Sequence, residues 1–158
     1  NPKGRVPSLI TSQGILTETP AILAFIAQLY PEYNMVPGSP FEFAQAQAFN
    51  CYIASTVHVA HAHKHRGSRW ADDKMAQSLM QAKVHQNMTE CASLIEAHYL
   101  VGPWVLGERY SMCDPYLALV TRWLDDDGIE VTKFPKIAAH NQAMRARPAM
   151  QTILRLHS

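Results

Sequence analysis

The spacing of apolar residues near the start of the chain predicts a β-hairpin followed by a helix. The segment 6–12 has the composition of a strand, and Ser12-Gln13-Gly14 is typical of a tight turn because glycine accepts a positive φ. Ile15 and Leu16 would form the partner strand. Residues 21–30 then show helical spacing, and the hydroxyl of Thr19 is expected to cap that helix.

The pattern beyond residue 40 predicts helices throughout. The stretch 31–40 holds three prolines and a glycine and has almost no periodicity, which is typical of a linker. Two long helices are expected next, because apolar residues recur at helical spacing on one face of each. These residues are Phe41, Ala44, Ala48, Tyr52 and Ile53 in the first helix, and Val84, Met88, Cys91 and Ile95 in the second.

A further helix is expected to form the centre of this helical part. Ser111-Met112-Cys113-Asp114 has the pattern of a capping box, with aspartate where glutamate is more common. Over 116–124 apolar residues surround the helix axis instead of forming one stripe, which predicts burial on most sides. Two short helices, begun by Pro135 and Pro148, are expected to follow.

Composition narrows the class of protein. The chain has 158 residues, of which 47% are hydrophobic, as in a globular protein. Its formal net charge of +1 and dispersed basic residues give no case for a nucleic acid or a membrane surface as partner. Cys51, Cys91 and Cys113 are odd in number and form no CxxC pair, which disfavours a disulfide framework and fits a reducing cytoplasm. No apolar run approaches the roughly 20 residues that span a bilayer.

Three motifs in a fixed order carry a family resemblance. They are Val6-Pro7 followed by the hairpin and Glu18-Thr19, the Ser-x-x-Asp box, and a terminal Phe-Pro with Arg-Ala-Arg-Pro. Together they resemble cytosolic glutathione transferases, nearest the bacterial beta and theta-like types. The resemblance covers essentially the whole chain. It implies an α/β thioredoxin-like fragment, a hairpin plus helix, followed by an all-α helical domain.

The resemblance also implies a division into domains and an incomplete catalytic apparatus. Residues 1–31 would be the second half of the thioredoxin-like domain, 32–40 the linker, and 41–158 the all-helical domain. In the family a Tyr, Ser or Cys activates the thiol. That residue, in a strand, helix and strand unit, is expected upstream of Asn1, so that the chain lacks it.

The residues that the resemblance assigns to glutathione lie near the hairpin. With a cis Val6-Pro7 bond, the backbone of Val6 would pair with the cysteinyl part of the tripeptide like an added strand. Glu18 would bind the γ-glutamyl ammonium, while the hydroxyl and amide of Thr19, at a helix N-terminus, would bind the carboxylate. The alternative is that Pro7 is a turn proline and Glu18-Thr19 ordinary first-turn residues. Lys3 is a further candidate, for the glycyl carboxylate, as is Arg5.

Several histidines follow on the first long helix. His58, His61 and His65 lie within an arc of about 60° and could in principle bind zinc, but no acid or thiolate lies near them in sequence, so no metal is expected. His58 matches a histidine that faces the sulfur in beta-type transferases, although Val59 replaces a lysine common there. The alternative is a set of histidines that favour the helix C-terminus.

The sequence therefore predicts a cytoplasmic, homodimeric glutathione transferase that joins glutathione, its co-substrate, to a small electrophile. The alternatives are a non-catalytic binding or dimerisation module of the same fold and a glutathione-dependent reductase or isomerase.

Overall fold

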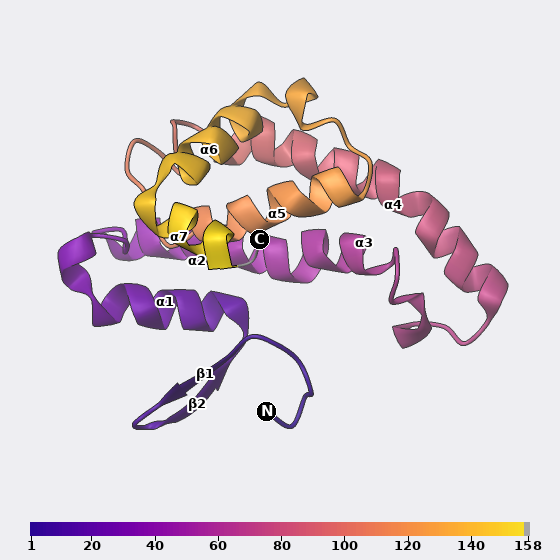
Figure 1. The fold of residues 1–158 in the computed structure, drawn as a ribbon, viewed down its shortest axis with the longest axis horizontal. Helices are drawn as coiled ribbons and strands as arrows, with labels where there is room; N and C mark the ends of the chain where they lie inside the picture. The colour runs from indigo at the N-terminus through magenta and orange to yellow at the C-terminus, as the bar shows by residue number, and fades with distance from the viewer. Residues whose placement is uncertain (157–158) are drawn as a thin grey trace.

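The computed structural model describes residues 1–156 and shows a hairpin beside a bundle of helices (Figure 1). Strands β1 (Ser8–Thr11) and β2 (Gly14–Thr17) precede α1 (Thr19–Leu29). The helical part contains α2 (Pro40–Tyr52), α3 (His58–Ala62), α4 (Lys74–Leu94), α5 (Asp114–Asp126), α6 (Pro135–Ala146) and α7 (Pro148–Leu156). This order confirms the expected fold class. The last two residues of the range 41–158 lie outside the described part.

The hairpin forms where the pattern predicted it, with shorter strands. β1 and β2 are antiparallel, and their register pairs Ser8 with Thr17 and Thr11 with Gly14. The Thr11 hydroxyl donates to the Gly14 carbonyl at 2.8 Å, and Gly14 has the positive φ of 139° that the turn required. Ile10 is 81% exposed, so the hairpin contributes little to the core of the described residues.

The start of α1 differs from the prediction by one residue. Thr19 is the first residue of the helix, and Glu18 is the capping position, because the Ile22 amide donates to the Glu18 carbonyl at 3.0 Å. Glu18 has φ 72° and its side chain makes no capping hydrogen bond. The expected Thr19 cap is therefore wrong. The first turn of α1 has no side-chain acceptor from its own capping residue.

A capping box that the sequence analysis missed begins α2. The Ser39 hydroxyl accepts from the Glu42 amide at 3.2 Å, and the Glu42 carboxylate accepts from the Ser39 amide at 3.1 Å. The helix continues through a π-helical stretch, Ile53–Val57, directly into α3. One long helical body thus runs from the end of the linker to the histidine-rich segment.

Only part of the predicted face of α2 enters the core. In α2 and the π-helical stretch the buried apolar residues are Ala46, Phe49, Ile53 and Val57, of which Ile53 belongs to the predicted face. Of the predicted face, Phe41 is 72% exposed, and Ala44 and Ala48 are exposed as well. The helix carries apolar residues on two faces, and the face with Phe49 and the β-branched side chains enters the core, where the π-helical stretch contacts α5. Hydrophobic spacing alone could not choose between them.

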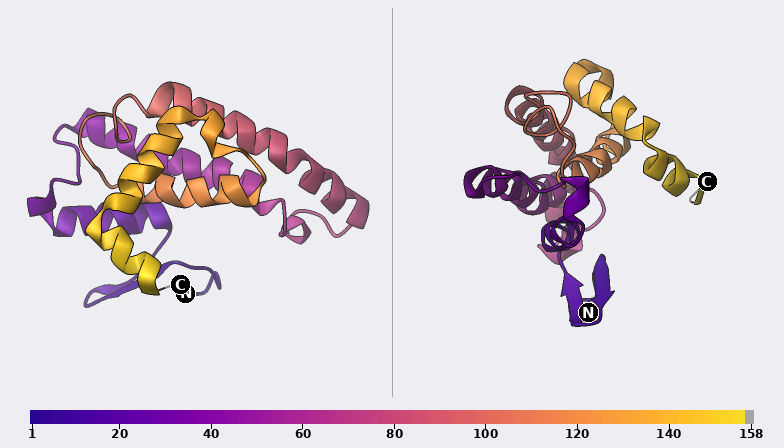
Figure 2. Two further views of the ribbon diagram at one scale, coloured as in Figure 1. Left: turned by 45° about the horizontal axis from the view of Figure 1, so that its top comes forward. Right: turned by 90° about the vertical axis from the view of Figure 1, so that its left-hand side faces the viewer.

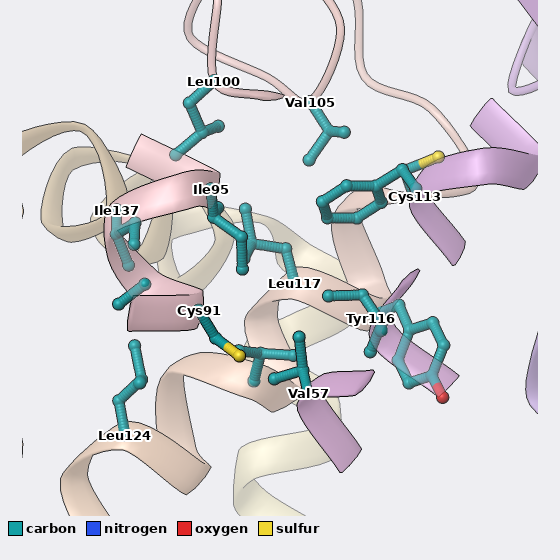
Figure 3. Packing of buried hydrophobic residues seen from close by; sticks show 14 of the residues in the cluster. Val57, Cys91, Ile95, Leu100, Val105, Cys113, Tyr116, Leu117, Leu124 and Ile137 are labelled. Carbon is teal, nitrogen blue, oxygen red and sulfur yellow. The ribbon is translucent and has the colours of Figure 1, made fainter. Parts of the chain in front are cut away.

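The remaining helices match their predictions. Val84, Met88, Cys91 and Ile95 are all buried, as the spacing along α4 indicated. Helix α5 lies at the centre of the bundle, with Tyr116, Leu117, Val120 and Leu124 buried (Figure 3). Helices α6 and α7 run along one side, with α6 packed on α5 (Figure 2). Within residues 1–156, no helix is long and apolar enough to cross a membrane.

The capping box before α5 forms with one change. The Asp114 carboxylate accepts from the Ser111 amide at 2.6 Å, as predicted. The Ser111 hydroxyl, however, accepts from the Cys113 amide at 3.2 Å and donates to Asp114 at 3.1 Å. Asp114 is itself the first helical residue, so the serine reaches only the amide two positions ahead.

Candidate functional site

A cavity of about 410 Å³ lies where the N-terminal loop, the start of α1, the end of the π-helical stretch and α5 meet. Every residue assigned to glutathione by resemblance lines it, together with the expected sulfur-side histidine: Lys3, Val6, Pro7, Glu18, Thr19 and His58. Arg5 lines it too. The fold therefore brings residues far apart in sequence to a single site.

The loop before β1 exposes the backbone edge of Val6. The Val6–Pro7 peptide bond is cis, and the Val6 side chain is 93% exposed. None of the backbone hydrogen bonds of the described residues involves Val6, because strand pairing begins at Ser8. The loop is held by Asn1, whose side-chain amide donates to the Arg5 carbonyl at 2.5 Å. An extended peptide can therefore pair with Val6.

Glu18 presents an ionised carboxylate at the rim of the cavity. Its Oε1 lies 2.5 Å from Nζ of Lys3, which also donates to the Thr17 hydroxyl at 3.2 Å. The Lys3 hydrogen bond, and next the Lys3 charge, lower the pKa of Glu18. Lys3, the candidate for a glycyl carboxylate, pairs with Glu18 in this structure. A positive φ at a residue other than glycine is uncommon and is typical of binding sites.

Thr19 shares the cavity with Tyr116 of α5, a residue that the sequence analysis did not place there. Burial raises the pKa of Tyr116. Tyr116 is 4% exposed and lines the cavity, whereas the sequence placed it in the core alone. A buried tyrosine hydroxyl needs a polar partner. That requirement was the one signal in the sequence that Tyr116 could lie at a site as well as in the core.

His58 forms part of the cavity wall on the side of α3. Its ring lies against Trp123 of α5, with ring centroids 4.9 Å apart and planes tilted by 30°. Burial, and next the positive charge of Arg66, lower the pKa of His58. The imidazole is therefore neutral near pH 7, a state in which it can accept a proton or donate one N–H.

The histidines do not come together as a metal site. His61 donates from Nδ1 to the Asp127 carboxylate at 2.8 Å, and His63 packs edge-on against Trp70. Among residues 1–156, no group of three or more His, Cys, Asp or Glu side chains is arranged to hold a metal ion.

Comparison with known proteins gives a consistent family. No family model matches the chain. The glutathione S-transferase GstA of Escherichia coli O157:H7 is 29% identical over 156 residues, covering 98% of this chain and 74% of that protein. Maleylacetoacetate isomerase of Pseudomonas aeruginosa is 25% identical, covering 96% of this chain and 74% of the enzyme.

A solved structure decides the assignment. A glutathione transferase homologue from Sulfitobacter, with bound glutathione, superposes with a TM-score of 0.96 and is 45% identical, covering 99% of this chain and 76% of that one. The chain belongs to the glutathione transferase family.

The motifs of the glutathione transferase family identified some of the residues that line the cavity and missed another. The family motifs identified Val6, which precedes the hairpin, and Glu18 and Thr19, which form the start of α1. Tyr116 was missed as a site residue because its spacing on α5 is that of a core side chain.

Proposed function

We propose that this chain binds glutathione in the cavity at Glu18 and forms part of an enzyme that transfers the glutathione thiol to a small electrophilic molecule. The observation that carries the proposal is the shared cavity of an ionised Glu18, an uncapped helix start at Thr19 and a free backbone edge at Val6. Its volume of about 410 Å³ lies within the roughly 300–1,000 Å³ of small-molecule sites.

The γ-glutamyl end of glutathione carries opposite charges close together, and the start of α1 offers both complements. The ammonium would pair with Glu18, which then shares or releases Lys3. The carboxylate would meet the Thr19 hydroxyl and the free first-turn amides of α1, where the helix dipole favours an anion. The released Lys3 would be free for the glycyl carboxylate. The cysteinyl backbone would pair with Val6.

The thiol of a peptide bound in this way would extend toward the side of the cavity formed by His58. A neutral His58 can hydrogen-bond the sulfur or take up its proton without adding a charge to the site. The Ser, Cys or Tyr that activates the thiol is proposed to precede Asn1, as the resemblance implies. Catalysis then divides between that residue and the cavity described above.

A homodimer is proposed as the working form. Phe41, Ala44 and Ala48 place an apolar strip on the exposed face of α2, which a second copy would cover. A cytoplasmic location is proposed as well, which the free thiols of Cys51, Cys91 and Cys113 support. Light scattering on wild type and on Phe41→Asp tests the dimer. A monomer in wild type at micromolar concentration would contradict it.

Substitution of Glu18 tests the glutathione site. Glu18→Ala should weaken glutathione binding by about tenfold or more, because a charge-assisted contact to the ammonium is lost. The matched control is Glu32→Ala, which removes the same charge from an exposed position outside the cavity. Affinities are measured by titration calorimetry. Equal affinity of Glu18→Ala and wild type would refute the proposed site.

A glutathione-dependent isomerase is the second candidate, favoured by the similarity to maleylacetoacetate isomerase. Both functions use the same glutathione site, so the Glu18 variant does not separate them. Two rates, measured on one preparation of the protein, do separate them: the rate at which the glutathione thiol replaces chloride on an activated aryl chloride, with release of chloride ion, and the rate of maleylacetoacetate isomerisation. A higher specificity constant for the isomerisation would favour the second candidate.

A further inference from the structure

Trp123 on α5 contacts two imidazoles of α3. The His61 ring is nearly parallel to the indole, with an interplanar angle of 8° and centroids 5.1 Å apart. The His58 ring lies 4.9 Å from the same indole at 30°. His58 lines the glutathione cavity, whereas His61 and Trp123 do not. The indole therefore connects the cavity wall to a residue outside the cavity.

Asp127 fixes the outer end of this arrangement. Its side chain is fully buried, and its Oδ2 accepts from Nδ1 of His61 at 2.8 Å. Nζ of Lys64 lies 3.3 Å from Oδ1, and Lys64 also donates to the Asp126 carbonyl. The separation of 3.3 Å makes an ion pair, while Oδ1 receives no well-directed hydrogen bond. The directed partner of the carboxylate is therefore His61.

The position of Asp127 needs a reason beyond the helix itself. It caps the C-terminus of α5, where the helix dipole disfavours a negative charge. Burial adds to that cost, because a carboxylate without water needs close partners. His61 and Lys64 supply them from α3 and the turn after it. The carboxylate of Asp127 is therefore unfavourable for α5 itself, but it holds the side chains of His61 and Lys64 against that helix.

We propose that Asp127 is a positioning residue for His58. It holds the His61 ring in one orientation, the stacked His61 holds the Trp123 indole, and the indole keeps the His58 imidazole in the wall of the glutathione cavity. The proposal rests on the proposed function, in which His58 faces the sulfur. It adds a chain of contacts that reaches the site from a residue outside it.

The geometry favours a rigid arrangement. The hydrogen bond to Asp127 fixes both the tautomer and the plane of His61. A parallel contact with an indole is lost when either ring turns, so fixing one ring restricts the other. His61 and His58 are three residues apart on one helix and so share a face. Both can therefore lie against the same indole.

The electrostatic surroundings of His58 determine in which direction its pKa should change when Asp127 is removed. The charged groups that act on its pKa are all cationic or basic: Arg66 and Arg69 after α3, His61 on α3, and Arg5 on the N-terminal loop. Removing a carboxylate at Asp127 would, through its field alone, lower the pKa of His58 further. Loss of the stacked, half-buried position would instead hydrate the ring and raise its pKa. A field effect and a positioning effect therefore have opposite directions.

The test compares Asp127→Ala with Asp126→Ala, which removes an adjacent, exposed acid. NMR titration of the imidazole protons gives the pKa of His58, assigned with His58→Gln, and nuclear Overhauser contacts report whether its ring touches Trp123. In Asp127→Ala the pKa should rise toward its ordinary value and the contacts should disappear. In Asp126→Ala both should remain. A fall or no change of the pKa in Asp127→Ala, with the ring contacts kept, would overturn the proposal.

Two further measurements keep the result interpretable. If Asp127→Ala does not fold, His61→Ala removes the same link, and retention of the contacts between His58 and Trp123 in that variant would overturn the proposal. Glutathione affinity should stay within about twofold of wild type in the Asp127 and His61 variants, because neither residue touches the peptide site. If the Glu18→Ala test fails, the proposal that glutathione binds in this cavity is refuted. If the Asp127→Ala test fails, glutathione binding stands and only the positioning role of Asp127 is refuted.

Discussion

Oδ1 of Asp114 and Nε2 of His140 lie 3.0 Å apart, and both side chains are completely excluded from solvent. The same carboxylate accepts from the Val105 amide at 2.8 Å and from the Ser111 amide at 2.6 Å. One carboxylate therefore links the loop before α5 and helix α6 to the start of α5.

Asp114→Ala should lower the free energy of unfolding by about 3–5 kcal/mol, because it leaves His140 and two amides buried without their acceptor. Urea unfolding followed by circular dichroism measures the change. Asp126→Ala, which loses an exposed acid of the same helix, should change stability by less than about 0.5 kcal/mol. A loss of under about 1 kcal/mol in Asp114→Ala would show that the network adds little to stability.

Much of this region could be predicted from the sequence, because the signals were local. Ser111 and Asp114 are three residues apart, and their spacing alone predicted that they would cap a helix. The bonds of Asp114 to Val105 and His140 could not be predicted, because the first depends on the fold of the loop before α5 and the second on the packing of α6 on α5. The local sequence therefore predicts the cap, whereas the additional hydrogen bonds of Asp114 depend on tertiary structure.

The candidate site divides in the same way. Glu18 and Thr19 follow a hairpin, so their place at a helix start could be read directly, although the positive φ of Glu18 shifted the helix start by one residue. Tyr116 lines the same cavity as Thr19 only because tertiary packing brings α5 to the start of α1, which no spacing rule encodes. The exposed Phe41 shows the converse limit, since apolar spacing does not state whether the core or another chain covers a face.

A close backbone approach makes Gly102 sensitive to substitution. A Cβ at this position would lie 2.5 Å from the Gly107 carbonyl oxygen, inside contact distance. Gly102→Ala should therefore destabilise the fold by about 1–3 kcal/mol, because it displaces the loop that carries Val105 to Asp114. Gly38→Ala is the control, since nothing lies within 4 Å of its added Cβ. Thermal unfolding distinguishes the two, and an equal effect in both would contradict the steric argument.

The thiols should differ strongly in reactivity. Burial raises the pKa of Cys113 to about 12, and burial raises the pKa of Cys91, whereas Cys51 is exposed. Because the thiolate is the reactive form, a disulfide reagent at pH 8 should modify Cys51 rapidly and the other two only on unfolding. Cys51→Ser should abolish the rapid phase. A rapid phase that persists in Cys51→Ser would mean that a buried thiol is reached from solvent.

The pairing of Lys3 with Glu18 predicts a pH dependence of glutathione binding. Glu18 must be ionised to bind an ammonium, so affinity is present above its pKa and is lost as the pH falls through it. The Lys3 hydrogen bond and charge lower that pKa in wild type. Lys3→Met removes both effects, so its loss of affinity should begin at a higher pH.

Calorimetric titrations between roughly pH 6 and 3.5 measure this difference, because the range brackets the ordinary pKa of a glutamate. Lys83→Met serves as the control, since Lys83 lies exposed on α4, outside the cavity, and its side chain hydrogen-bonds Gln86. The acid profile of the control should coincide with that of wild type. If Lys3→Met and wild type lose affinity over the same pH interval, either Glu18 does not bind the ammonium or Lys3 does not control its ionisation. Direct NMR titration of the Glu18 carboxylate in Lys3→Met then separates these two explanations, since its pKa must rise if Lys3 controls it.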